Sequence, residues 1–222
     1  MDIKPLDRLT ETLRLLLKIN IAIAVAAVFA GIYDCHSYAN LPSGFDPNET
    51  ILPCDVVTAI VGLTQFVFLI IVGVTFLRWI HRTNKNLHAL AGEQMTFTPG
   101  WSVGWYFIPI ANLFKPYQGM KEIWQISHKN RAAALTVVGW WWALWLISNF
   151  LGQLAFRLAV RTEDAAGYNA SSIAFILSDG LDVMLSIVAL MLVTRIWVAY
   201  SENILEEGAS TDGEFAALRP QL

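Results

Sequence analysis

The chain has 222 residues, of which 55% are hydrophobic and 15% are charged, and its mean hydropathy is +0.49. Soluble domains usually carry about 25% charged residues, so the composition excludes an ordinary soluble protein, and the many aromatic residues exclude a disordered one. A net charge of −3 provides no basic surplus to neutralise phosphates, so we expect no nucleic acid partner. An integral membrane protein remains.

Four apolar stretches are long enough to cross a bilayer as helices. About 20 residues are needed, because each helical residue rises about 1.5 Å and the hydrocarbon core is about 30 Å thick. The stretches are too long for barrel strands. We therefore predict an all-α fold, an integral membrane four-helix bundle in a single transmembrane domain over residues 1–200, with spans at residues 13–33, 56–77, 132–156 and 173–194.

The basic residues predict the orientation. Four spans divide the remaining segments between the two sides of the membrane. Of the fifteen Lys and Arg residues, thirteen fall on the side that holds both termini, and only Arg157 and Arg161 fall on the other side. Because basic loops stay cytoplasmic, both termini are predicted to be cytoplasmic. A signal peptide cleaved after residues 28–30 is an alternative for the first span. An amphipathic helix leading into that span is favoured by leucines at helical spacing, namely Leu6, Leu9, Leu13, Leu16 and Leu17.

The only two cysteines, Cys35 and Cys54, bracket the first loop, which the charge distribution places outside the cell. Disulfides persist there, and two neighbouring helix ends can bring the α-carbons within bonding range. We therefore expect a disulfide and neither a metal nor a cofactor. Free thiols are one alternative, and a metal site formed by Cys35, His36, Cys54 and Asp55 is another.

The middle stretch, residues 78–131, is predicted to form a cytoplasmic cap apposed to the membrane. The helix of the second span continues to about Ala91, and Gly92 can end it. The apolar run 101–114 is too short to span and contains Pro109, which interrupts a helix, so we expect a re-entrant or interfacial segment. A helix over residues 117–126 is then predicted to lie on the membrane.

Aromatic and polar residues gather in this cap. They can form a belt that anchors the cap at the interface, where indole rings favour one wet and one apolar side. They can also form a pocket for a ligand or lipid, or a surface for a partner, and the candidate residues are Trp101, Trp105, Pro109, Asn112, Pro116, Tyr117 and Trp124.

The same stretch resembles a known family. The residues that carry the resemblance are 82–87 (RTNKNL), 99–101 (PGW), 104–113 (GWYFIPIANL), 115–117 (KPY), and Met120 with 122–124 (EIW). They are similar to the bacterial membrane family called domain of unknown function 4328. The resemblance implies a multi-pass protein of the bacterial cell (inner) membrane, and it supplies no activity or catalytic residue.

Polar residues recur inside the third and fourth spans. Asn149, Gln153 and Arg157 share one face of the third span, and Asp179 and Asp182 share a face of the fourth at comparable depth. An ionised Asp in the bilayer normally faces a partner or water, because its insertion is costly. We expect a salt bridge to Arg157 with amide hydrogen bonds; a proton or ion path and simple contact with water are the alternatives.

Enzymatic motifs are sparse. The cap holds His81, His88, Glu93, Glu122 and His128, which we expect to be solvated at the interface. No metal-protease pair, phosphate-binding glycine loop or nucleophile elbow occurs.

Three functions remain open. The first is a non-catalytic protein that binds lipid or a partner through the cap. The second is an oligomeric small channel or transporter that uses Asp179 and Asp182, and the third is an interface enzyme that uses the histidines. The expected partners are the lipid bilayer and a membrane or cytoplasmic protein or a second copy of the chain. Residues 201–222 are predicted to form a flexible acidic tail.

Overall fold

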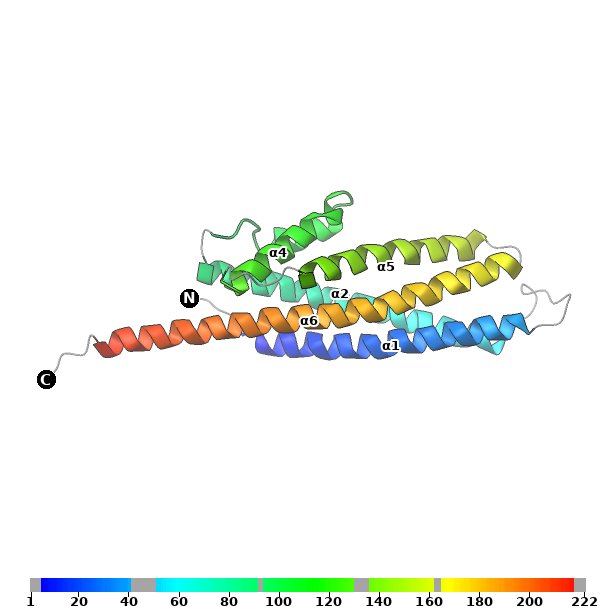
Figure 1. The fold of residues 1–222 in the computed structure, drawn as a ribbon, viewed down its shortest axis with the longest axis horizontal. Helices are drawn as coiled ribbons and strands as arrows, with labels where there is room; N and C mark the ends of the chain where they lie inside the picture. The colour runs from blue at the N-terminus through cyan, green and yellow to red at the C-terminus, as the bar shows by residue number, and fades with distance from the viewer. Residues whose placement is uncertain (1–4, 41–50, 92–93, 130–135, 162–164, 218–222) are drawn as a thin grey trace. The chain divides into compact units, whose positions relative to one another are not determined.

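Four long helices dominate the computed structural model, which describes residues 5–40, 51–91, 94–129, 136–161 and 165–217. They are α1 (Asp7–Ala39), α2 (Pro53–Ala91), α5 (Thr136–Arg161) and α6 (Ala165–Ala217) (Figure 1). Each contains a stretch long and apolar enough to cross a membrane. The predicted all-α fold with four spans is therefore confirmed for the described residues, which contain no strand.

Short helices occupy the stretch between α2 and α5. They are α3 (Trp101–Gly104), η2 (Trp105–Phe107), η3 (Ala111–Leu113) and α4 (Lys115–Ser127). Ile108 ends η2 in an extended conformation, with φ −99° and ψ 113°. The ring of Pro109 disfavours helical geometry at the preceding residue, so the apolar run cannot continue as one helix.

The described chain separates into two compact units. The cap unit comprises residues 1–10, 79–138 and 191–222, and the span unit comprises residues 11–78 and 139–190. All four long helices contribute residues to both units. The single domain predicted over residues 1–200 therefore stays a prediction.

Large buried side chains form the interior of the cap unit. Trp79 is 0% exposed, and its Nε1 donates a hydrogen bond to Oγ1 of Thr10 at 3.0 Å. Thr10 donates in turn to the carbonyl of Leu6 at 3.0 Å. Other core residues of this unit are Leu6, Ile80, Leu87, Met120, Ile123, Leu192 and Ile196.

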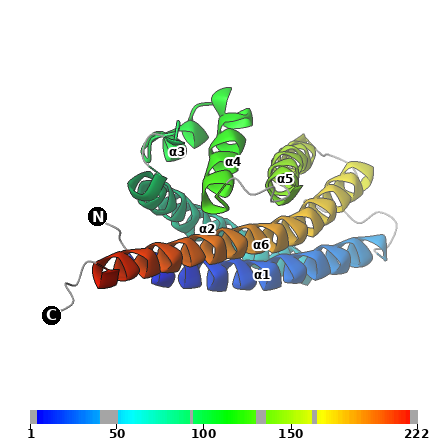
Figure 2. The ribbon, with the colours of Figure 1, turned by 60° about the vertical axis from the view of Figure 1, so that its left-hand side comes forward.

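The apolar face of α4 belongs to this interior. Met120, Ile123 and Trp124 are at most 2% exposed. They share one face of the helix, but that face is packed inside the protein, so it is not free to lie on a membrane as predicted for residues 117–126. In the cap unit α4 contacts α3, η2 and η3 (Figure 2).

Small side chains and hydrogen bonds join α1 and α6 in the span unit. A Cβ added to Gly31 would lie 2.7 Å from Cγ1 of Ile176, so glycine permits this close approach. Asn20 Nδ2 donates to Oγ of Ser186 at 3.0 Å. Large apolar side chains elsewhere in this unit are exposed, including Phe150 at 72%. Small residues at helix contacts and apolar side chains facing outward are typical of membrane bundles.

Helix α6 ends at Ala217, so it extends far into the segment for which we expected a flexible tail. Residues 218–222 of that segment lie outside the described residues.

Candidate functional site

Three side chains of the cap unit hold the irregular segment 96–99 in place. Nδ1 of His81 lies 2.9 Å from the carbonyl oxygen of Pro99, and Nε2 of His88 lies 2.9 Å from that of Phe97. The carboxylate of Glu122 accepts hydrogen bonds from the backbone N–H groups of Thr96, at 2.5 Å, and Phe97, at 3.0 Å. Because an irregular segment cannot pair its own backbone groups, these side chains supply the missing partners.

The two remaining residues of this set, His128 and Glu93, are not placed beside the segment 96–99 by any contact that the structure describes. His128 Nδ1 lies 2.8 Å from the carbonyl oxygen of Trp124 in its own helix, and the two rings stack with centroids 4.3 Å apart. Glu93 lies outside the described residues. The contacts of His81, His88, Glu122 and His128 with the backbone favour structural roles for these four side chains.

Residues 82–87 of α2 form hydrogen bonds to the segment before α1 and to α6 within the cap unit. Arg82 Nη1 donates to the carbonyl of Pro5 at 3.2 Å, and Asn86 Nδ2 donates to the hydroxyl of Tyr200 at 2.9 Å. The sequence contained these residues within its most distinctive motif. Their partners, which lie near the two ends of the chain, could not be predicted from it.

The apolar segment of the cap turns its large side chains outward. Phe107 is 72% exposed, Ile110 76%, Leu113 56% and Phe114 44%. At the start of the same run, Trp101 is 51% exposed. In a water-soluble domain such side chains would form the core, so this outward arrangement is the reverse of the usual one.

Polar atoms of the same segment point inward. Ser102 is 5% exposed, and its hydroxyl donates to the carbonyl of Pro99 at 2.7 Å. The hydroxyl of Tyr106 and Oδ1 of Asn112 are buried with no hydrogen-bond partner among the described residues. Burial raises the pKa of Tyr106 above its ordinary value, so the phenol stays protonated.

Lys115 follows the outward segment. Its ammonium group lies 5.5 Å from the ring centroid of Phe97 and 5.6 Å from that of Trp105. The Trp105 ring lies 4.6 Å from that of Trp101. A cation therefore lies beside two half-buried aromatic rings, in the distance range of cation–π attraction.

The seven residues predicted to form a pocket separate into outer and inner groups. Trp101 and Pro109 are exposed, Pro116 and Trp124 are buried, and Trp105, Asn112 and Tyr117 are intermediate. They all belong to the cap unit. The seven residues therefore do not line one common pocket, because Trp101 and Pro109 face outward while Pro116 and Trp124 belong to the interior.

The carboxylates of α6 have neutral partners in the span unit. Gln65 Nε2 donates to Oδ1 of Asp179 at 2.8 Å, and the hydroxyl of Ser148 donates to Oδ1 of Asp182. The predicted salt bridge to Arg157 is not formed, because Arg157 is exposed and these carboxylates are oriented by side chains of α2 and α5. Gln65 and Ser148 were missed, although a glutamine inside an apolar span was an available signal.

The rest of the predicted polar cluster faces away from these carboxylates. Asn149 is exposed, and its Nδ2 donates to the carbonyl of Trp145 within α5 at 2.7 Å. Gln153 is exposed as well. The predicted five-residue cluster is thus replaced by two hydrogen-bonded pairs.

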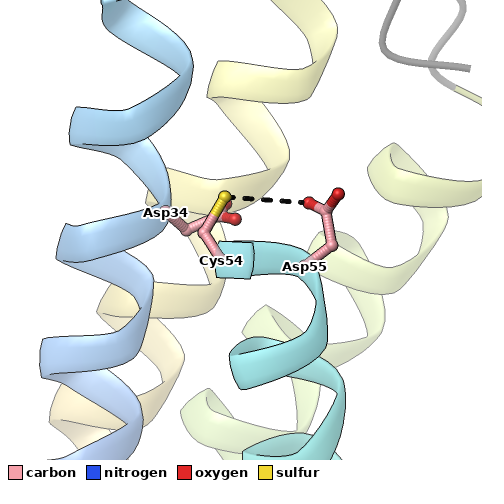
Figure 3. A group of neighbouring side chains, drawn as sticks. All are labelled: Asp34, Cys54 and Asp55. Atoms are coloured by element: carbon pink, nitrogen blue, oxygen red, sulfur yellow. Dashed lines mark hydrogen bonds between the residues drawn. The ribbon is translucent and has the colours of Figure 1, made fainter. Parts of the chain in front are cut away.

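The expected disulfide is not present, since Cys35 and Cys54 are free. Cys54 is 0% exposed, and its thiol points toward the carboxylates of Asp34 and Asp55 (Figure 3). Asp34 is 4% exposed, whereas the next residue, Cys35, is half-buried. Successive side chains point about 100° apart around a helix, so with Asp34 toward Cys54 the Cys35 side chain points elsewhere.

Asp34, Cys54 and Asp55 are the group of described residues that could hold a metal ion. One potential ligand atom from each lies within 4.8 Å of the others. Asp55 also stabilises the start of α2, because its Oδ2 accepts the backbone N–H of Leu52 at 2.7 Å. Asp34 was not among the candidate metal ligands predicted from the sequence.

A comparison with protein-family models matches residues 48–197 to a family described as Domain of unknown function (DUF4328). The match includes α2, the short helices, α5 and most of α6. No match was found among curated proteins or among solved structures.

Proposed function

The chain belongs to the DUF4328 family, and from the geometry of its cap we propose that it is a non-catalytic membrane protein that binds lipid at the cytoplasmic membrane surface. The lipid-binding surface is defined here as residues 107–114 together with Trp101. The charge distribution along the sequence motivates the cytoplasmic placement.

The observation that carries this proposal is the reversed polarity of the segment 101–114. Phe107 and Ile110 are each more than 70% exposed, while Ser102 and the polar atoms of Tyr106 and Asn112 are buried. Apolar side chains that face acyl chains gain the free energy that they would lose in water, about 25 cal/mol per Å² of buried apolar area. A chain with four candidate spans always has a bilayer available to it.

The backbone of this surface favours a shallow position. Its backbone hydrogen bonds lie within short helical turns. The N–H of Asn112 donates to the carbonyl of Ile108 at 2.8 Å, and the N–H of Phe114 donates to the carbonyl of Ala111 at 3.2 Å. Irregular backbone exposed to lipid is not tolerated in the hydrocarbon core. We therefore place the surface at the boundary between headgroups and acyl chains, where Lys115 can attract an anionic headgroup.

Photocrosslinking of the full chain in native membranes tests this proposal. A photoreactive amino acid replaces Phe107 or, in a second variant, Ile110, and a matched control replaces exposed Glu202 of α6. We expect lipid adducts in the mass spectra of the first two variants, at least tenfold above the control. A single crosslinked protein partner, or a second copy of the chain, at Phe107 and Ile110 would contradict lipid binding.

A channel or transporter is a second candidate function, motivated by the pairs Gln65–Asp179 and Ser148–Asp182. Carboxylates with neutral partners inside a span can take up and release protons. In liposomes, proton flux that falls at least tenfold in Asp179→Asn and Asp182→Asn would support this function. Flux at the level of empty liposomes in the unmodified protein would exclude it.

A further inference from the structure

Acidic groups from two helix ends converge in the span unit. Asp34 lies near the end of α1, while Cys54 and Asp55 lie in the first turn of α2 (Figure 3). Their potential ligand atoms all lie within 4.8 Å of one another. From this convergence we propose that Asp34, Cys54 and Asp55 bind a thiophilic divalent metal ion of the zinc class.

The chemistry of the three side chains selects the class of metal. Zinc takes a thiolate at about 2.3 Å and carboxylate oxygens at about 2.0–2.2 Å, and three protein ligands leave a fourth position for water or another donor. Magnesium and calcium prefer oxygen ligands alone, so the thiolate disfavours both. The spread of the three atoms is small enough for rotamer changes to gather them around one ion.

Hydrogen bonds orient both carboxylates. Ser172 Oγ donates to Oδ2 of Asp34 at 3.1 Å, and the hydroxyl of Tyr38 donates to Oδ1 of Asp55 at 2.8 Å. Each carboxylate oxygen has two lone pairs, so these bonds leave capacity for a metal. Outer hydrogen bonds of this kind are how proteins orient metal ligands.

Burial and local charge give an independent reason for a cation. Cys54 is 0% exposed and Asp34 is 4% exposed. Bringing buried carboxylates and a thiolate side by side is costly, and a divalent ion lowers that cost.

Ordinary structural roles explain the residues singly. Asp55 stabilises the start of α2, and a buried cysteine can serve as a small apolar residue. The Cys54 thiol also donates a weak hydrogen bond to Oδ1 of Asp55 at 4.0 Å (Figure 3). These roles do not account for the position of Asp34, which reaches the same group from the other helix.

The test uses the full chain, purified in detergent with reductant and freed of metal. Zinc is added, excess is removed by dialysis, and bound zinc is measured by mass spectrometry; cobalt serves as a second probe, because thiolate coordination gives a charge-transfer band. We expect one zinc per chain, at least tenfold weaker binding in Cys54→Ser and in Asp34→Asn, and loss of the cobalt band in Cys54→Ser. Cys35→Ser is the matched control and should bind zinc as the unmodified protein does.

Folding is monitored separately in each variant. Added zinc should raise the thermal midpoint of the unmodified protein and of Cys35→Ser, since a ligand that binds the folded state stabilises it. It should raise the midpoint of Asp34→Asn less than that of the unmodified protein at the same zinc concentration. Less than 0.1 zinc per chain in the unmodified protein, an equal loss of zinc in Cys35→Ser, or a Cys35–Cys54 disulfide in protein isolated without reductant would overturn the proposal.

Discussion

Both units contain polar side-chain pairs between helices, and the cap unit differs in that its side chains also bond to irregular backbone. In the span unit, polar side chains bond to one another between helices, as in Asn20–Ser186 and Gln65–Asp179. In the cap unit, His81 and Glu122 bond to backbone groups of the segment 96–99. A helix pairs its own backbone, whereas irregular chain needs partners from elsewhere.

Because of this difference, removing one side chain should lower the stability of the two units by different amounts. Losing a side-chain pair between spans leaves the backbone ladders intact, so the loss should be small. Losing a side chain that holds irregular backbone leaves unpaired N–H or C=O groups, so the loss should be larger.

Trp79→Ala should have the largest effect, because it removes a fully buried indole and its hydrogen bond to Thr10 from the cap unit. Truncation of a buried aromatic side chain costs about 3–5 kcal/mol. Thermal unfolding of the full chain in detergent measures the loss. Trp101→Ala, in which the removed indole is 51% exposed, should change stability by less than about 0.5 kcal/mol. Equal losses in the two variants would contradict the assigned core.

Glu122→Ala should free the segment 96–99, because two backbone N–H groups lose their acceptor. Hydrogen bonds to charged groups contribute about 1.5–3 kcal/mol, which corresponds to roughly 10- to 100-fold faster amide exchange. Hydrogen exchange measured at Thr96 and Phe97 gives this factor. Glu202→Ala provides the control on exposed α6, and unchanged exchange in Glu122→Ala would show that the segment is held by other contacts.

The pair Gln65–Asp179 should show a small coupling in a double-mutant cycle with leucine at each position. Hydrogen bonds between membrane helices average about 0.6 kcal/mol in such cycles. The same cycle between Arg157 and Asp179 distinguishes the structure from the salt bridge expected from the sequence. We predict a coupling energy near zero for Arg157 and Asp179. A coupling energy larger than that of Gln65 and Asp179 would support the salt bridge instead.

Tyr106→Phe should have the smallest effect, because it removes a buried hydroxyl that has no partner among the described residues. Deleting an unpaired buried polar group is close to neutral or stabilising, within about 0.5 kcal/mol. Thermal unfolding in detergent again measures the change. A loss above about 1 kcal/mol would mean that the hydroxyl is hydrogen-bonded in solution.

The helices of this protein could be predicted from sequence because they follow local rules. Long apolar runs indicated the four spans, and Pro109 marked the break in the cap. The partners of polar residues depend on which faces meet in three dimensions. The sequence therefore predicts Arg157 as the partner of Asp179, whereas the structure gives Gln65. It likewise predicts Cys35 beside Cys54, whereas the structure gives Asp34.

The sequence singled out the stretch that holds the outward apolar surface, but not the direction in which its side chains face. The aromatic and proline residues of the cap were identified, and the outward apolar surface lies among them. The sequence could not show that Met120 and Trp124 turn inward while Phe107 and Ile110 turn outward, because both segments carry large apolar side chains and only packing separates them.

The immersion depth of residue 110 tests whether the lipid-binding surface of the cap contacts the bilayer. A spin label attached through a genetically encoded keto amino acid at this position preserves both cysteines, and a label at half-buried Lys121 of α4 serves as the control. In liposomes, the label at 110 should be more accessible to oxygen than to a water-soluble nickel complex, and the label at 121 should show the reverse. Preferential access of the nickel complex to the label at 110 would contradict contact between this surface and lipid.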